Sequence, residues 1–280
     1  MEFVKAPPGR DLSLSGLSLR VPALAAGAAD FGVTTVPYVL AAQAEAGGGL
    51  PVRFISVFHQ RHPIAGVVAD ESPIAVIGDL AGRRTASHTL PWFVTEYGYG
   101  LRAAGMAADF VPSSGGDYGA AALAGGLVEV VPTWADTLPV VRRTAGFAVR
   151  AIPLGLSAYS SGVIAADRVP AEVAARMRDA LAAAMELQRR RPDLGATAYQ
   201  AKFPQIPLDD IRLSWSSFVR HGWGEGPAGS MDERTWQRTV ALTSAMHSLP
   251  APAPERLYRP DLLVDAPEGV LAAAPGGPSS

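Results

Sequence analysis

Two short groups of hydroxyl and imidazole side chains lie where predicted strands pass into predicted helices. Thr34 and Thr35 follow one apolar strand, and Ser87, His88 and Thr89 follow another. Hydroxyl groups, together with the free backbone N–H groups at a helix N-terminus, bind anions and carbonyl oxygens. The same residues also suit helix capping, with Thr35 and Thr89 as N-cap residues. The sequence therefore predicts polar binding loops, capped helices, or both at once.

Aromatic and histidine side chains form a second set of candidates. Trp134 follows a predicted strand, where an indole can stack on a planar ligand, cover a cation, or close a hydrophobic core. Tyr159 offers a phenol that either hydrogen-bonds a ligand or braces a connection between two parts of the chain. His59 follows a strand end, so we expect it at the rim of the same site.

Metal and covalent chemistry are not expected. His59 and His62 fall in a predicted loop with no third ligand nearby in the sequence, so they do not predict a metal site. His221 and His247 are expected on helix surfaces. The chain contains no cysteine, which excludes disulfides, thiol nucleophiles and thiolate metal sites. It also lacks a Gly-rich phosphate loop with its lysine and a G-x-S-x-G motif, so no cofactor is expected.

Strands and helices alternate around these candidates. Strands are predicted at residues 2–5, 30–34, 52–58, 65–70, 108–112, 127–132, 147–152 and 161–167. Helices are predicted at residues 17–26, 36–46, 92–104, 117–124, 170–190, 208–220 and 231–247. Such alternation favours α/β architecture with parallel sheets and helices on both faces. The sequences of the strands at 65–70 and 161–167 are similar, which suggests that the two strands are neighbours in one sheet.

Length and composition limit the classes of protein that fit. The 280 residues allow one large domain or two ordinary ones, and 48% hydrophobic residues are enough for a core. A net charge of -2 argues against a nucleic-acid partner, which would favour a basic surface. The sequence has no unbroken apolar run of membrane-spanning length. Its first residues lack the pattern of a secretory signal.

Four motifs, taken in this order and spacing, resemble a known family. The chain is similar to the type II solute-binding proteins of ABC transporters, in the branch for nitrate, sulfonates, taurine and thiamine pyrimidine precursors. The motifs are ALAAGAADFGVT (residues 23–34), ADESPIAVIGDLAGRRTAS (69–87), GAAALAGGLVEVVPTW (119–134) and SSGVIAADRVP (160–170).

This resemblance implies a two-lobed α/β fold of the periplasmic-binding-protein type, each lobe a mainly parallel sheet flanked by helices. It implies a discontinuous first lobe of residues 1–84 and 151–265, a second lobe of residues 85–150, and a disordered tail of residues 266–280. The family usually has a strand and a helix ahead of residues 2–4, so the first lobe is expected to lack that unit.

The functional expectation is capture of a small anionic or aromatic solute between the lobes, without catalysis. The resemblance places ligand contacts on the loops that hold Thr34, Ser87 and Trp134. It implies an ABC permease as partner, a monomer, and a periplasmic or extracellular location, or a cytoplasmic one if the start of the chain is genuine. The alternative is an enzyme on the same scaffold, a lyase or desulfinase-like protein acting on a small aromatic acid through a cleft histidine.

Overall fold

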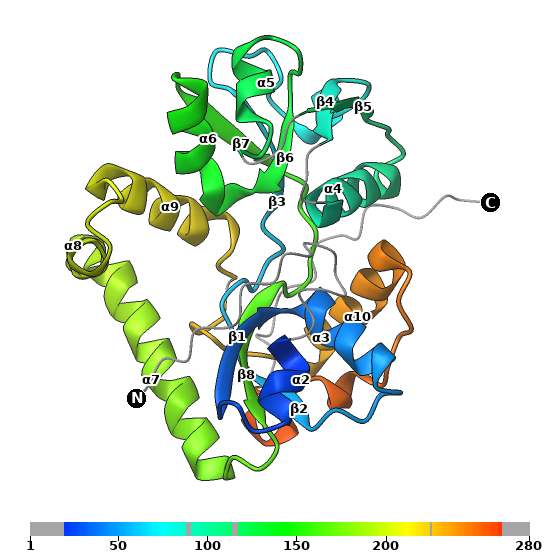
Figure 1. Cartoon of the computed structure of the whole chain (residues 1–280), viewed down its shortest axis with the longest axis vertical. Helices are drawn as coiled ribbons and strands as arrows, with labels where there is room; N and C mark the ends of the chain where they lie inside the picture. Colours follow the sequence, from blue (N-terminus) through cyan, green and yellow to red (C-terminus); the bar gives the residue numbers. More distant parts are fainter. Residues whose placement is uncertain (1–19, 88–90, 114–116, 225, 265–280) are drawn as a thin grey trace.

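The computed structural model describes residues 20–87, 91–113, 117–224 and 226–264, which form two lobes (Figure 1). The lower lobe in that view contains α2 (Arg20–Ala25), β1 (Phe31–Thr35), α3 (Val36–Glu45), β2 (Val52–Val57), β8 (Ser161–Ala166) and α10 (Glu233–His247). The upper lobe contains β3 (Ile64–Ala69), β4 (Arg84–Ser87), α4 (Pro91–Ala103), β5 (Asp109–Pro112), α5 (Ala120–Ala124), β6 (Val131–Trp134), α6 (Leu138–Ala145) and β7 (Val149–Pro153).

Three more helices stand beside the two lobes. They are α7 (Ala171–Arg190), α8 (Pro192–Lys202) and α9 (Leu208–His221). α7 rises along the lower lobe, α8 turns the chain, and α9 returns toward α6 of the upper lobe (Figure 1). The sequence predicted α7 and α9 but neither α6 nor α8. The strand predicted at residues 2–5 and the tail at 266–280 lie outside the described residues.

Both principal sheets are antiparallel, so the expectation of mainly parallel sheets is wrong. β8 lies between β1 and β2 and is antiparallel to both, and β3 lies in the same way between β6 and β7. The path of the chain explains this: β2 runs toward the upper lobe, whereas β8 returns from it. β4 and β5, which α4 connects, do form a parallel pair. The similar strands β3 and β8 belong to different sheets and are not neighbours.

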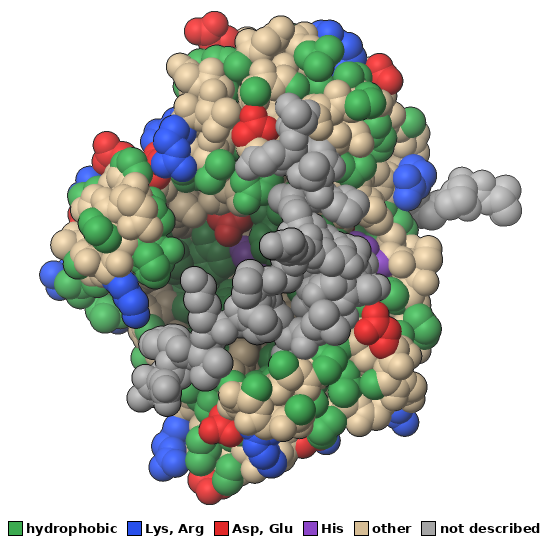
Figure 2. All heavy atoms as spheres, viewed as in Figure 1, with side chains coloured by type: hydrophobic (Ala, Val, Ile, Leu, Met, Phe, Trp, Pro, Cys, Tyr) green, Lys and Arg blue, Asp and Glu red, His purple; other side chains and the backbone are tan. Residues whose placement is uncertain are grey.

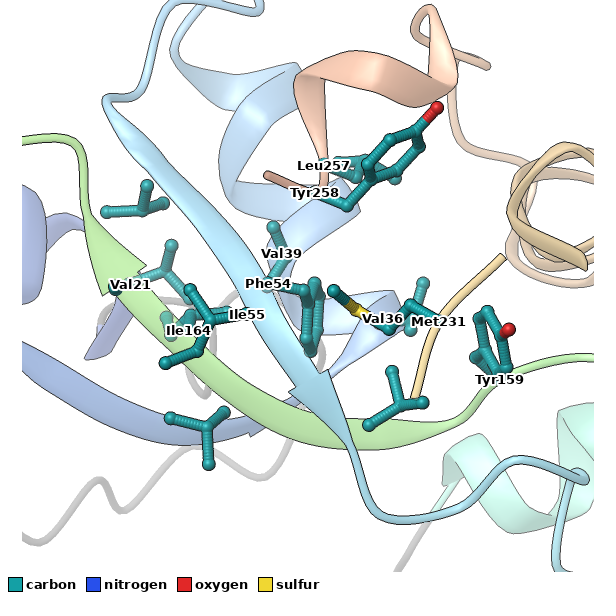
Figure 3. Packing of buried hydrophobic residues seen from close by; sticks show 14 of the residues in the cluster. Val21, Val36, Val39, Phe54, Ile55, Tyr159, Ile164, Met231, Leu257 and Tyr258 are labelled. Atoms are coloured by element: carbon teal, nitrogen blue, oxygen red, sulfur yellow. The ribbon is translucent and has the colours of Figure 1, made fainter. Parts of the chain in front are cut away.

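The hydrophobic cores separate the lobes at positions that differ from the expected boundaries of 84/85 and 150/151. The lower core uses residues up to Phe58 and again from Tyr159, whereas the upper cores use residues from Ile64 to Leu156 together with Leu213 of α9. Figure 3 shows Phe54 and Ile164 from neighbouring strands of the lower core. We therefore propose that the lobes divide near residues 58–64 and 156–159.

The chain segments that cross between the lobes are hydrogen-bonded to one another. The backbone N–H of His62 donates to the carbonyl oxygen of Leu156 at 3.2 Å. The amide of Gln60 donates to the carbonyl oxygen of Pro227 at 2.8 Å and accepts from the N–H of Gly224 at 3.1 Å. These bonds tie the first crossing (residues 58–63) to the second (154–160) and to the segment that leads from α9 to α10.

Helix α9 is held to the upper lobe by a buried carboxylate. Arg142 and Arg143 of α6 each donate to a different oxygen of Asp210 at 2.7 Å. The hydroxyl of Ser217 donates to the carbonyl oxygen of Ala135 at 2.6 Å. α7, α8 and α9 therefore bridge the two lobes, because α7 contributes Met177 and Leu181 to the lower core.

Replacing Asp210 by alanine is expected to lower the free energy of unfolding by about 1 to 2 kcal/mol. Two charge-assisted hydrogen bonds are lost, but both arginines are partly exposed and remain hydrated. Urea denaturation measures the loss. The matched control is Asp209→Ala, since the Asp209 side chain is 82% exposed and pairs with exposed Arg212. Its expected change is below about 0.5 kcal/mol, and an equal loss in both variants would contradict the assignment to Asp210.

Within the described ranges, none of the helices combines the length and the apolar character that crossing a membrane requires.

Candidate functional site

A cavity of about 960 Å³ lies between the lobes on the side closed by α7, α8 and α9. Figure 2 shows it as a hollow with hydrophobic walls and with acidic and histidine side chains inside it. The walls come from the first crossing, from the turn η2 (Ala135–Thr137) with α6, and from α7 to α9. The apolar side chains that line it include Phe58, Leu181, Met185, Tyr199, Trp215 and Phe218. A space of this size and composition is typical of a small-molecule site.

His59 is the predicted site residue that the structure places in the wall of this cavity. It lies in the first crossing, and its ring is almost fully buried. Nδ1 is 2.5 Å from the hydroxyl oxygen of Ser161, at the start of β8. Nε2 is 3.6 Å from Oδ2 of Asp136 in η2, which is longer than a hydrogen bond. His59 thus lies between a residue of the lower lobe and one of the upper lobe.

Two polar atoms beside the cavity have no hydrogen-bond partner among the described residues. They are Nε2 of His59 and Oδ1 of Asp136, and both are buried. Buried polar atoms without partners are rare in proteins and costly, because they have lost their water. The Asp136 side chain as a whole remains 25% exposed. The inner end of the cavity therefore holds a partly exposed carboxylate beside a buried imidazole.

The contacts of Trp134 agree with the core role, one of the two roles expected for it. Its ring lies edge-on to His59, with centroids 5.4 Å apart, and also edge-on to Phe93 in the upper core at 5.5 Å. Its indole N–H donates to Glu96 at 3.4 Å. Trp134 therefore packs against the His59 ring while it also closes the upper core. Its direct contact with a ligand stays a prediction.

Thr34 and Thr35 end β1 as expected. Thr35 stands opposite Ser161 in the sheet, and Thr34 stands opposite Gly162. Residues directly opposite in antiparallel strands present their side chains on the same face, so Thr35 shares a face with the serine that binds His59. Thr35 does occupy the N-cap position of α3, but its side chain makes no capping hydrogen bond.

Tyr159 braces the lower lobe rather than facing the cavity. Its hydroxyl donates to Asp232 at 2.8 Å and accepts from the backbone N–H of Asp232 at 2.9 Å. Burial raises the pKa of this phenol. The ring lies edge-on to Trp236 at 5.2 Å, and Figure 3 shows it at the end of the core cluster near Met231. Of the two roles expected for Tyr159, these contacts favour bracing.

Ser87 ends β4 in the upper lobe, and its carbonyl oxygen accepts from the N–H of Ser113 at 3.1 Å. His88 and Thr89 lie outside the described residues. The anion-binding turn expected at these three residues stays a prediction.

A second group of titratable side chains is buried where α4 of the upper lobe meets α10 of the lower lobe. Oε1 of Glu96 lies 3.4 Å from Nε2 of His247 and 3.8 Å from Nε2 of His62. The His247 side chain is 2% exposed, so its expected place on a helix surface is wrong. Burial holds the pKa of His62 below its usual value, as do His59 and His247, while the Glu96 carboxylate acts in the opposite direction.

Sequence reasoning missed Asp136, Glu96 and the wall formed by α8 and α9. Asp136 lies two residues beyond Trp134, and an acidic residue so close to a predicted site residue was the available signal. Glu96 lies inside a predicted helix with nothing to mark it as buried. Among the described residues, no group of three histidine, aspartate or glutamate side chains is arranged to hold a metal ion.

Comparison with known proteins agrees with this fold. Residues 15–192 match the model of the family described as NMT1/THI5 like. No curated protein sequence matches the chain. The structure is similar to the periplasmic aliphatic sulphonate-binding protein SsuA from Escherichia coli, at 19% identity and a TM-score of 0.63, over 94% of this chain and 85% of that chain. It is also similar to the alkanesulfonate-binding protein SsuA from Xanthomonas axonopodis pv. citri, at 18% identity and a TM-score of 0.58, over 89% and 85% of the two chains.

A further similar structure is that of the desulfurization enzyme DSZB with biphenyl-2-sulfinic acid, at 16% identity and a TM-score of 0.54, over 89% of this chain and 88% of that chain. At these identities the likeness shows the fold, which is the periplasmic-binding-protein-like fold expected from the motifs. The family model covers more than half of the chain. The protein therefore belongs to the NMT1/THI5-like family.

Proposed function

We propose that this protein is the solute-binding component of an ABC-type importer and that it holds a small solute with an aromatic or other apolar body between its lobes. The observation that carries the proposal is the cavity itself. Its walls come from the first crossing, from the upper lobe and from the helices that bridge the lobes, and two polar atoms beside it have no hydrogen-bond partner among the described residues. Of the anionic and aromatic solutes expected from the sequence, the lining favours the aromatic class.

Two kinds of likeness support the importer role. The family and the sulphonate-binding neighbours share this fold, and those neighbours are periplasmic proteins. We accordingly propose a periplasmic or extracellular location, an ABC permease as partner, and a monomer. Binding in this arrangement needs no reaction, because closure of the lobes around the solute creates the surface that a permease recognises.

A second candidate function is an enzyme that uses His59 as an acid or base. The observation that favours it is the row Ser161, His59 and Asp136, in which a buried imidazole is bonded to a hydroxyl and lies near a carboxylate. The fold of a desulfurization enzyme is also similar. The long distance from Nε2 to Asp136 makes this the weaker candidate, since a general base needs an orienting partner within hydrogen-bond reach.

Narrowing the cavity is expected to weaken solute binding. Val140 lines the cavity, so Val140→Trp should weaken binding at least about tenfold, as overpacked sites lose the space a ligand needs.

A thermal-shift screen with benzenesulfonate, octanesulfonate, taurine, nitrate and 4-aminopyrimidine identifies the solute. A solute present at 100 times its Kd should stabilise the wild type by about 2.7 kcal/mol.

The matched control is Val76→Trp, at a side chain 59% exposed and outside the cavity, which should bind as the wild type does. If Val140→Trp binds the solute with unchanged affinity, the site lies elsewhere. Mass spectrometry of solute recovered from the complex separates the two candidate functions. Recovery of an altered molecule would favour the enzyme, and recovery of the same molecule would favour the importer.

A further inference from the structure

We propose that the solute carries a cationic or hydrogen-bond-donating head group, and that this group lies against Asp136 at the inner end of the cavity. The inference rests on the proposed function and names the class of its solute. Such a head group differs from the sulfonates named for the similar structures. An anionic head group requires positive charge or hydrogen-bond donors around it, whereas the inner end of this cavity holds a carboxylate.

Within the described ranges, the Asp136 carboxylate accepts no hydrogen bond at Oδ1, and its ion-pair distance to His59 is long, with 3.6 Å between Oδ2 and Nε2. The Asp136 carboxylate also acts on the Tyr118 phenol, because burial and this carboxylate both raise the pKa of Tyr118. An anionic head group at the same place would face a carboxylate of its own sign, and like charges at close range in a partly buried site repel strongly.

Two hydroxyl groups near Asp136 are already engaged. The Thr137 hydroxyl donates to the carbonyl oxygen of Trp134 at 2.8 Å, and the Ser214 hydroxyl donates to the carbonyl oxygen of Asp136 at 2.8 Å. Neither is therefore available as a donor to an anion in this arrangement. The carboxylate accepts hydrogen bonds and cannot donate them when ionised, so the complementary ligand group is a donor such as an ammonium or a hydroxyl.

The guanidinium group in the lining does not supply an anion site at that end. Arg143 is the arginine or lysine among the described residues that line the cavity, and its Nη1 donates to Asp210 at 2.7 Å. The Arg143 side chain is 53% exposed, so water screens the remainder of its charge. Its place on α6, paired toward α9, is apart from the inner end formed by His59 and Asp136.

Aromatic rings complete a pocket that suits a cation with an apolar body. Trp215 and Phe218 of α9 stack with centroids 5.1 Å apart, and Phe218 meets His59 edge-on at 5.0 Å. Aromatic faces attract cations and also bury flat apolar groups. A carboxylate behind aromatic walls is therefore chemically suited to an arylalkyl amine or an alcohol of the same shape.

Three probes with the same phenylethyl body and different head groups test the proposal. They are 2-phenylethylamine, 2-phenylethanol and 2-phenylethanesulfonate, each titrated calorimetrically into the full-length protein at pH 8, well above the usual titration range of histidine. The ammonium should bind at least about tenfold more tightly than the sulfonate, with the alcohol between them. In Asp136→Asn the preference for the ammonium should shrink at least about tenfold, because the amide carries no charge.

Two controls separate the effect of the Asp136 charge from general effects on the protein. Asp209→Asn removes an exposed carboxylate outside the cavity and should keep the full preference. Binding of the neutral alcohol by Asp136→Asn reports that the cavity is intact. If the sulfonate binds best and Asp136→Asn changes nothing, the head-group inference is wrong while solute binding stands. If no probe binds to the wild type at millimolar concentration, both the inference and solute binding in this cavity are wrong.

Discussion

Replacing Gly162 by alanine is expected to destabilise the lower lobe severely. Gly162 lies in β8, the central strand of the lower sheet, opposite Thr34 on one side and Val57 on the other. A Cβ atom at this position would overlap the carbonyl oxygen of Ser56 and stand 2.9 Å from the Cα of Val57. Both neighbours are backbone of β2, so no side-chain rotation relieves the overlap.

The expected cost exceeds that of ordinary overpacking, which is typically about 1 to 3 kcal/mol. A loss above about 3 kcal/mol should lower the melting temperature by at least about 6 °C or abolish soluble expression. Circular dichroism on heating measures it. The matched control is Gly78→Ala, because a Cβ there meets no atom within 4 Å. A Gly162→Ala protein that melts within 2 °C of this control would show that β2 and β8 do not pair as described.

Local sequence patterns were sufficient for the strands of the lower sheet. The run from Ser161 to Ala166 is apolar and is followed by a Pro-initiated helix, and the structure places β8 and α7 at those residues. The strand and helix around Thr35 were predicted within one residue. In each case the signal lies inside a window of about ten residues, where hydrophobic periodicity and turn residues act directly.

Strand direction could not be predicted in this way. Whether β8 lies parallel or antiparallel to β2 depends on the intervening path through the upper lobe, which brings β8 back toward its own lobe. Alternation of strands and helices predicted parallel pairing because it assumes that successive strands start at the same edge of one sheet. β1 and β2, joined by α3, and β6 and β7, joined by α6, do run in the same direction, but in each pair a strand of opposite direction, β8 or β3, lies between them. Among the described strands, β4 and β5, joined by α4, are successive strands that are also parallel neighbours in the sheet.

The candidate site was predicted in part for the same reason. His59 was found because a strand precedes it, but its contacts with Asp136 and Ser161 join residues that are 77 and 102 positions away in the sequence. Tyr159 was placed near the right connection, yet its two plausible roles differ only by which way the phenol points. The family resemblance supplied the order of the loops and left these orientations undetermined.

Acidification is expected to destabilise the junction between the lobes through His62. This side chain is buried at the first crossing, where Glu96 of α4 lies close to both His62 and His247 of α10, and His59 is nearby. Burial lowers the pKa of His62, the positive forms of His59 and His247 add to that lowering, and Glu96 opposes it. The folded protein therefore holds His62 neutral at pH values where an exposed histidine takes up a proton.

The sign of the pH dependence follows from this difference. Above pH 6.5, the usual histidine pKa, His62 is neutral in both the folded and the unfolded chain and stability does not depend on it. As the pH falls below about 6.5, only the unfolded chain binds the proton, so His62 removes up to about 1.4 kcal/mol of stability per pH unit until the lowered pKa of the folded state is reached.

Urea denaturation between pH 7.5 and 5.5 tests this, comparing the wild type with His62→Gln. Below pH 6.5, the free energy of unfolding should fall less steeply with decreasing pH in the variant, by up to about 1.4 kcal/mol per pH unit, which is the contribution of one bound proton. Glutamine does not titrate, and it keeps a polar side chain beside Glu96. His221→Gln serves as the comparison, since His221 is only half-buried on α9, outside the Glu96 cluster, and burial and Arg220 lower its pKa as well. If His62→Gln keeps the wild-type slope, His62 titrates alike in the folded and unfolded chains, and the Glu96 cluster does not hold it neutral where α4 and α10 meet.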